Sequence, residues 1–223
     1  MALDMEGASS ATPEPAVKIS SRAFGRVVAG YAVAAGALVA FITINGASAV
    51  PPLASGVTAV LISVGLLLPT AGMLMLRRGF DKTRSSARNG LVMQGFGLVV
   101  LLLGIILAVT SSSLSGFFAA TVLLIASGGS VLAGTFLFRK HYTSIGVSRL
   151  RGVDYLLLGM VLLLSGMGLI VASNIAYEYF LSQVGNAVYG DIGATVSACG
   201  CIVAAYSFSL LYHVPANRHE ISL

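Results

Sequence analysis

Charged side chains that could act as acids or bases lie at the ends of the apolar stretches of this sequence. Asp154 follows Arg151 by three positions, so a local ion pair or a helix-start role explains it, and Asp191 has the position of an N-cap. Asp154, Arg151 and His213 could meet at one membrane interface and act on a lipid. Charges in the middle of membrane helices mark ion and proton pathways, and the apolar stretches carry none there. We therefore expect no enzyme, no proton-coupled transporter and no cation pump.

Residue types that bind metals or cofactors are few and unfavourably spaced. Cys199 and Cys201 are two positions apart, which on a helix turns them about 200° from each other. They can neither share a metal nor form a disulfide in a continuous helix. The histidines lie at or beyond the ends of apolar stretches: His141, His213 and His219. The negative end of a helix dipole favours His141 and His213 there. We expect no catalytic residue, no metal and no cofactor.

Three polar side chains inside apolar stretches could contact a solute. Gln94 is the most polar of them, and Ser165 and Tyr206 are the others that we consider. Each can also be satisfied by its own backbone or by an adjacent helix. Packing between helices is one interpretation, and a pathway for a small neutral or lipid-like solute is the other.

The elements that position these residues follow from the composition. Of the 223 residues, 57% are hydrophobic and 9% are charged, whereas soluble domains carry about 25% charged residues. Crossing about 30 Å of hydrocarbon takes about 20 apolar residues in a helix. Six stretches qualify, near residues 26-45, 56-76, 90-111, 116-138, 153-174 and 192-212. The predicted fold class is an all-α integral membrane protein with a six-transmembrane-helix bundle over 23-212, a disordered tail over 1-22 and a short tail over 213-223. Pro69 predicts a kink in the second span.

The Lys and Arg residues predict the orientation of these spans. They fall in the N-terminal tail, after the second span, after the fourth span and near the C-terminus, which are all on one side of a six-span bundle. Basic loops stay in the cytoplasm, so both termini are expected there, in the plasma (inner) membrane of a prokaryote or an organellar equivalent. Four basic residues at helix ends are expected to contact lipid headgroups: Arg77, Arg78, Arg139 and Lys140.

Small residues recur with an internal period of about 62 residues. The shift aligns Gly90, Gly97 and Gly104 with Gly152, Gly159 and Gly166, and Gly72 with Gly134. Weaker copies are Ala29, Gly36 and Thr43 in the first span and Gly193, Gly200 and Ser207 in the sixth, while Gly65 extends the pattern in the second. A seven-residue spacing of small residues lets two helix backbones approach. We expect three helical hairpins, 26-76, 90-138 and 153-212, with pseudo-threefold symmetry.

The segment between the fifth and sixth spans is more than a connection. It is aromatic and nearly uncharged, and its apolar residues recur at three- and four-residue spacing. We expect a short interfacial helix within 175-190 that covers the bundle or contacts a partner. The residues proposed for partner contact are Tyr177, Tyr179, Phe180 and Tyr189.

Three two-helix units with basic ends on one side resemble, in topology and Gly/Leu texture, the HdeD type of small bacterial membrane proteins. The resemblance implies the architecture and no particular activity. Our leading hypothesis is a non-catalytic accessory or scaffolding subunit of a larger membrane complex, and the alternative is a passive channel or carrier. The expected partners are the lipid bilayer and either other membrane-protein subunits or further copies of the chain. No nucleic-acid partner is expected, because the net charge of +5 lies in the loops and tails.

Overall fold

The computed structural model describes residues 21–45, 52–79, 85–110, 113–144, 151–180 and 183–212, and all regular structure in them is helical. The helices are α1 (Ser21–Asn45), α2 (Pro52–Gly79), α3 (Ser85–Thr110), α4 (Leu114–Ser144), α5 (Arg151–Phe180) and α6 (Gln183–Tyr212). Helix α1 begins at Ser21, so the disordered tail expected over 1–22 is wrong for its last two residues. Residues 1–20 and the tail expected over 213–223 lie outside the described residues.

Six helices among the described residues are long and apolar enough to cross a membrane, and their number matches the six apolar stretches in the sequence. The apolar windows within them are Ser21–Thr43, Val60–Arg78, Ser86–Leu107, Phe118–His141, Arg151–Ala172 and Val188–Tyr212. The helices extend beyond these windows. α2 begins at Pro52, a residue suited to the first turn because its missing amide hydrogen has no helical partner there. It continues through Pro69 without ending.

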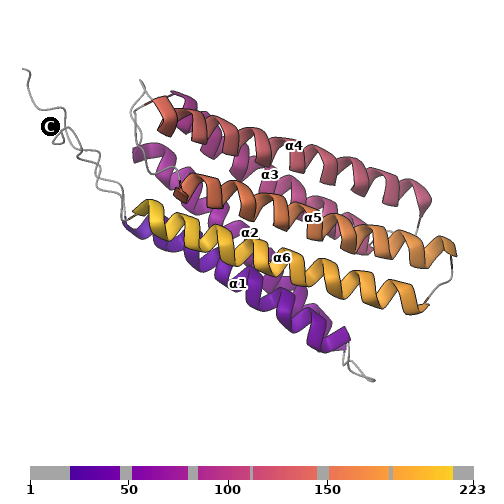
Figure 1. The fold of residues 1–223 in the computed structure, drawn as a ribbon. Helices are drawn as coiled ribbons and strands as arrows, with labels where there is room; N and C mark the ends of the chain where they lie inside the picture. The colour runs from indigo at the N-terminus through magenta and orange to yellow at the C-terminus, as the bar shows by residue number, and fades with distance from the viewer. Residues whose placement is uncertain are drawn as a thin grey trace, which may run out of the picture.

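The helices form a closed ring in chain order, with α1 beside α6 (Figure 1). Contacts near the helix ends show that neighbours run antiparallel. Phe24 near the start of α1 lies 5.5 Å from Tyr212 at the end of α6, between ring centroids. Arg139 near the end of α4 pairs with Asp154 near the start of α5. All Lys and Arg side chains among the described residues therefore gather at one end of the bundle, which we call the basic end.

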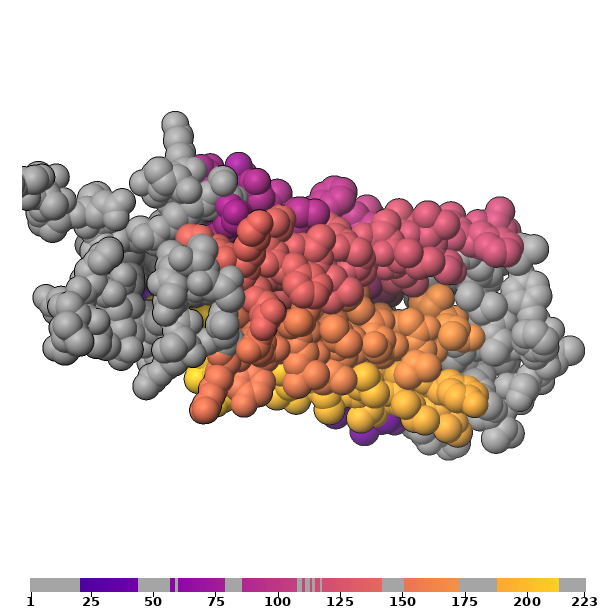
Figure 2. Space-filling model, turned by 45° about the horizontal axis from the view of Figure 1, so that its top comes forward, coloured from indigo at the N-terminus to yellow at the C-terminus, as the bar shows by residue number. Residues whose placement is uncertain are grey.

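The six seams of the ring are not equally tight. The closest packing joins α1 to α2, α3 to α4 and α5 to α6, and the loosest seam joins α4 to α5. Figure 2 shows the face on which α4 and α5 lie side by side, with the surface hollowed between them. A Cβ built on Gly128 of α4 would come no closer than 3.8 Å to Leu164 of α5. The molecule is thus three tight helix pairs joined by weaker seams.

Large side chains fill the centre of the ring. Tyr31 of α1 stacks on Phe208 of α6, with ring centroids 6.3 Å apart, and its hydroxyl lies 3.8 Å from the sulfur of Met160 in α5. Other large, fully buried residues come from α2, α3 and α5: Leu66, Met73, Leu91, Leu98, Leu101 and Leu163. These buried side chains form one hydrophobic core among the described helices.

The predicted connection between the fifth and sixth spans is wrong. α5 continues to Phe180 and α6 starts at Gln183, so most of segment 175–190 belongs to these two helices and not to a separate interfacial helix. The three- and four-residue spacing was a helical signal, but it continues the helix before it. Asp191 accordingly lies inside α6 and is not its N-cap. By contrast, the serine-rich turn between α3 and α4 is short as predicted, and Ser113 accepts a hydrogen bond from the Gly116 amide at 3.2 Å.

Candidate functional site

The α3–α4 seam is built on backbone contact at glycine. A Cβ added to Gly134 would lie 2.6 Å from the Gly90 carbonyl oxygen, and one added to Gly90 would lie 2.9 Å from the Phe138 nitrogen. A Cβ on Gly97 would lie 3.0 Å from the Ser127 carbonyl oxygen. The hydrogen of a glycine fits at these positions, whereas the Cβ atom of any other residue would be too close to the neighbouring backbone. The predicted packing role of these glycines therefore agrees with the geometry.

The α5–α6 seam has the same construction. A Cβ on Gly159 would lie 2.8 Å from the Ala204 nitrogen, and one on Gly200 would lie 2.7 Å from the Gly159 carbonyl oxygen. Gly166 faces the backbone of Gly193. The outermost positions are looser: a Cβ on Gly104 would lie 3.2 Å from Leu124, and one on Gly152 would lie 3.1 Å from Leu211.

The α1–α2 seam corrects one of our expectations. Ala29, Gly36 and Thr43 are exposed, and a Cβ on Gly36 would meet nothing within 4 Å. The small residues of α1 that α2 contacts lie on another face, where Gly65 approaches Ala34 and Gly72 approaches Ala23. Gly30 packs against the ring of Pro69. Helix α1 has small residues at seven-residue spacing on two faces, and spacing alone does not identify the buried one.

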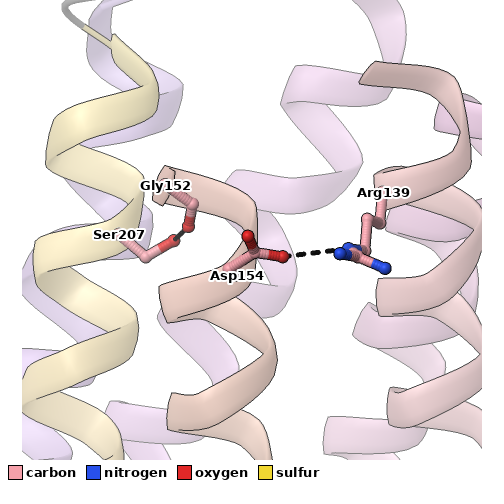
Figure 3. A network of polar contacts seen from close by, with 4 residues as sticks. All are labelled: Arg139, Gly152, Asp154 and Ser207. Atoms are coloured by element: carbon pink, nitrogen blue, oxygen red, sulfur yellow. Dashed lines mark hydrogen bonds and ion pairs between the residues drawn. The ribbon is translucent and has the colours of Figure 1, made fainter. Parts of the chain in front are cut away.

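Hydroxyl and amide groups add hydrogen bonds across the tight seams. Gln94 Nε2 of α3 donates to Thr135 Oγ1 of α4 at 3.0 Å. Ser130 Oγ donates to the Met93 carbonyl at 2.9 Å. In α6, Ser207 donates to the Gly152 carbonyl (Figure 3). These bonds join neighbouring helices at three positions across the tight seams.

The predicted solute-contact residues do not converge. Gln94 is fully buried in the α3–α4 seam, whereas Ser165 and Tyr206 lie on the outer surface of α5 and α6. Tyr206 packs edge-to-face on Tyr155, 5.8 Å between ring centroids. The expectation of a shared pathway fails because the helix faces that carry these side chains point in different directions.

A surface groove of about 240 Å³ lies instead at the basic end, between α1 and α6. Its lining is apolar apart from hydroxyl groups: Ser21, Phe24, Gly25, Val28, Ser209 and Tyr212.

The predicted headgroup residues lie at the basic end. Arg77 and Arg78 are exposed in the last turn of α2, and Lys140 is exposed on α4. Arg139 differs, because its Nε donates to Asp154 Oδ1 at 2.9 Å (Figure 3). Asp154 thus pairs across the α4–α5 seam and not with Arg151 of its own helix. His213, the third residue considered for a lipid-modifying site, lies outside the described residues.

The end of the bundle opposite the basic end carries the predicted partner contacts. Tyr189 of α6 is 56% exposed. Tyr177, Tyr179 and Phe180 lie on the last turns of α5, and their side chains are outside the described residues. Sequence reasoning missed that Asp191 lies near them inside α6, with its Oδ1 atom enclosed and without a hydrogen-bond partner.

The cysteines are placed as the spacing predicts, with Cys199 exposed and Cys201 buried. Within the described helices, no three His, Cys, Asp or Glu residues come together as a metal site would require. No family model, curated protein or solved structure matches this chain.

Proposed function

We propose that this chain is a multi-pass membrane protein that serves as a non-catalytic accessory or scaffolding subunit of a larger membrane complex. Six apolar helices support insertion. The gathering of basic residues at one end supports an orientation with that end, and both termini, in the cytoplasm. The membrane is the plasma (inner) membrane of a prokaryote or an organellar equivalent.

The proposal includes a threefold repeat of the hairpin. Seam contacts in the second and third hairpins correspond when α3 is shifted by about 62 residues onto α5 and α4 by about 73 onto α6: Gly97 meets Ser127 and Val131, and Gly159 meets Gly200 and Ala204. In the first hairpin, Gly30 against Pro69 takes the place of Gly97 against Val131. The same contact recurring three times supports descent from one hairpin.

The observation that carries the scaffolding role is the combination of large buried side chains inside the ring with aromatic residues at the end opposite the basic end. Tyr31, Phe208 and Met160 are buried and contact one another inside the ring. At the end opposite the basic end, α5 and α6 reach beyond α1 (Figure 1). α5 extends past polar residues Ser173 and Asn174, where its apolar stretch ends. A bundle with a packed hydrophobic core and aromatic residues at one end suits protein contact better than solute passage.

The test is the size of the native complex. We expect replacement of Tyr177, Tyr179 and Tyr189 by Ser to shift the tagged chain to a smaller species on a native gel of mild-detergent extracts. Phe118→Ala is the matched control, because it removes an exposed aromatic ring from α4 at the same end. An unchanged complex in the triple variant, or no complex in the wild type, contradicts the proposal.

A further inference from the structure

The groove between α1 and α6 at the basic end has an aromatic floor and an open side. Phe24 is buried and packs on Tyr212 and Phe208, with ring centroids 5.5 Å and 6.3 Å away. Ser21 and Gly25 are exposed on α1, and a Cβ added to Gly25 would meet nothing within 4 Å. The groove is therefore open to the outside along Gly25, and packed rings form its floor.

The groove lies at the level where the apolar windows of both helices end. The α1 window begins at Ser21 and the α6 window ends at Tyr212, and both residues line the groove. From Ser21 to Val28 the groove follows α1 for about 10 Å, at 1.5 Å per residue. In a bilayer its outer end, with two hydroxyl groups, lies near the lipid headgroups, and its inner end lies beside the hydrocarbon.

The charge around the outer end of the groove is positive. Arg22 is exposed and lies three positions before Gly25, which makes the two residues neighbours on the surface of α1. Arg26 faces the other seam of α1, where its Nη1 atom contacts the sulfur of Met75 in α2. Asp154 is the only acidic residue that the structure describes at this end, and it is paired across the α4–α5 seam. The surroundings therefore complement an anionic group.

We propose that this groove binds one anionic phospholipid, with an acyl chain along Gly25 and Val28 and the phosphate headgroup beside Arg22. This inference rests on the membrane insertion in the proposed function and adds a specific lipid. Apolar contact with Phe24 and Val28 holds the chain, and the charge of Arg22 selects the headgroup. A bilayer supplies such molecules at this level of the bundle.

The test uses the purified full chain in phosphatidylcholine vesicles that contain a small fraction of a photoactivatable lipid. Two probes carry the same diazirine-labelled acyl chain, one with a phosphatidylglycerol headgroup and one with a phosphatidylcholine headgroup. After irradiation, mass spectrometry of peptides locates the labelled residues. We expect the phosphatidylglycerol probe to label the groove residues of α1 and α6 about fivefold more than the phosphatidylcholine probe does.

One variant fills the groove and has a matched control. Gly25→Leu adds its side chain into open space, so the fold is kept and labelling of the groove by the anionic probe should fall about tenfold. Gly36→Leu is the control, because Gly36 is also exposed on α1 with nothing within 4 Å of an added Cβ, and it lies outside the groove. It should leave the labelling unchanged.

A second pair of variants tests the selection of the headgroup. Arg22→Gln should remove most of the preference for the anionic probe, whereas Arg22→Lys should retain it. Arg78→Gln removes another exposed cation at the basic end, on α2, and should not change the preference. Should Gly25→Leu fail to fold, these three variants still decide the question.

Each failure has a separate meaning. Equal labelling of the groove by both probes, or labelling that survives Gly25→Leu, overturns this inference. Labelling that occurs elsewhere on the chain but not in the groove also overturns it, because another part of the chain then covers the groove. If the chain does not insert into vesicles, the proposed function fails first. If the lipid is selected but native membranes contain no larger complex, the accessory role fails and this inference stands.

Discussion

At the residue scale, replacing glycine by alanine is expected to have opposite effects on stability at two kinds of position. A Cβ at Gly200 would lie 2.7 Å from the Gly159 carbonyl oxygen, whereas one at Gly36 would meet nothing within 4 Å. We expect Gly200→Ala to lower the free energy of unfolding by about 1–3 kcal/mol, because two backbones must separate. Gly36→Ala should be neutral or stabilising by up to about 1 kcal/mol, since alanine favours the helix. Thermal unfolding in detergent measures both, and equal effects would refute the seam assignment.

Removing one partner of the Gln94–Thr135 hydrogen bond is expected to cost more stability than removing the other. Thr135→Val leaves the Gln94 amide nitrogen buried without its acceptor, so we expect a loss of about 1–2 kcal/mol in unfolding free energy. Gln94→Met should cost less, because it also removes an Oε1 atom that has no partner. The Thr135 hydroxyl keeps its bond to the Val131 carbonyl at 2.8 Å. Denaturant unfolding of the two variants in micelles distinguishes them, and a larger loss for Gln94→Met would contradict this account.

Residue types were easier to predict than residue surroundings. The glycines at 97, 134 and 159 were found from spacing, because lipid leaves close backbone contact as the main source of helix affinity. Gly36 was misassigned because α1 presents small residues on two faces. Asp191 was misassigned because an acid near an expected helix start resembles a cap whether or not the helix begins there.

At the element scale, a surface ion pair crosses the loosest seam, between α4 and α5. Both Arg139 and Asp154 remain partly exposed, so Asp154→Asn should change global stability by less than about 1 kcal/mol. We expect a local effect instead: spin labels at Phe136 and Leu158 should show a broader distance distribution. Labels at Leu158 and Ile202, across the tight α5–α6 seam, should not change.

These measurements need a chain in which Cys199 and Cys201 are replaced by Ala. Arg151→Gln is the matched control, since it removes a nearby charge that lies on α5 outside the ion pair. Broadening across both seams would mean general loosening, and broadening across neither would mean that the ion pair does not hold α4 to α5.

Helix existence was predictable from apolar length, but helix ends were not. α5 and α6 run through Tyr177 and Tyr189 because that segment contains no proline and keeps helical spacing. Polar residues end an apolar stretch, but they do not end a helix. The boundary predicted at residue 174 is therefore the end of the apolar stretch and not the end of α5.

At the scale of the whole molecule, the antiparallel ring predicts which positions share a side of the membrane. Ser113→Cys should react with a membrane-impermeant maleimide in right-side-out vesicles, in a chain without other cysteines. Asn89→Cys, near the basic end, should react only after permeabilisation. The reverse pattern would invert the orientation, and labelling of both would contradict a single topology.

The contact between Phe24 and Tyr212 has a consequence for how the chain can be cut and rejoined. Because the first and last helices are neighbours in the ring, the same ring of helices could be built by a chain that begins at a different helix. A circular permutant that links residue 20 to residue 213 and opens at 145–150 keeps every helix pair and every orientation. We expect this permutant to fold. We also expect the three hairpins, when they are expressed as separate chains, to reassemble the ring. An ancestral protein made of separate hairpins, before their genes fused, would have assembled in the same way.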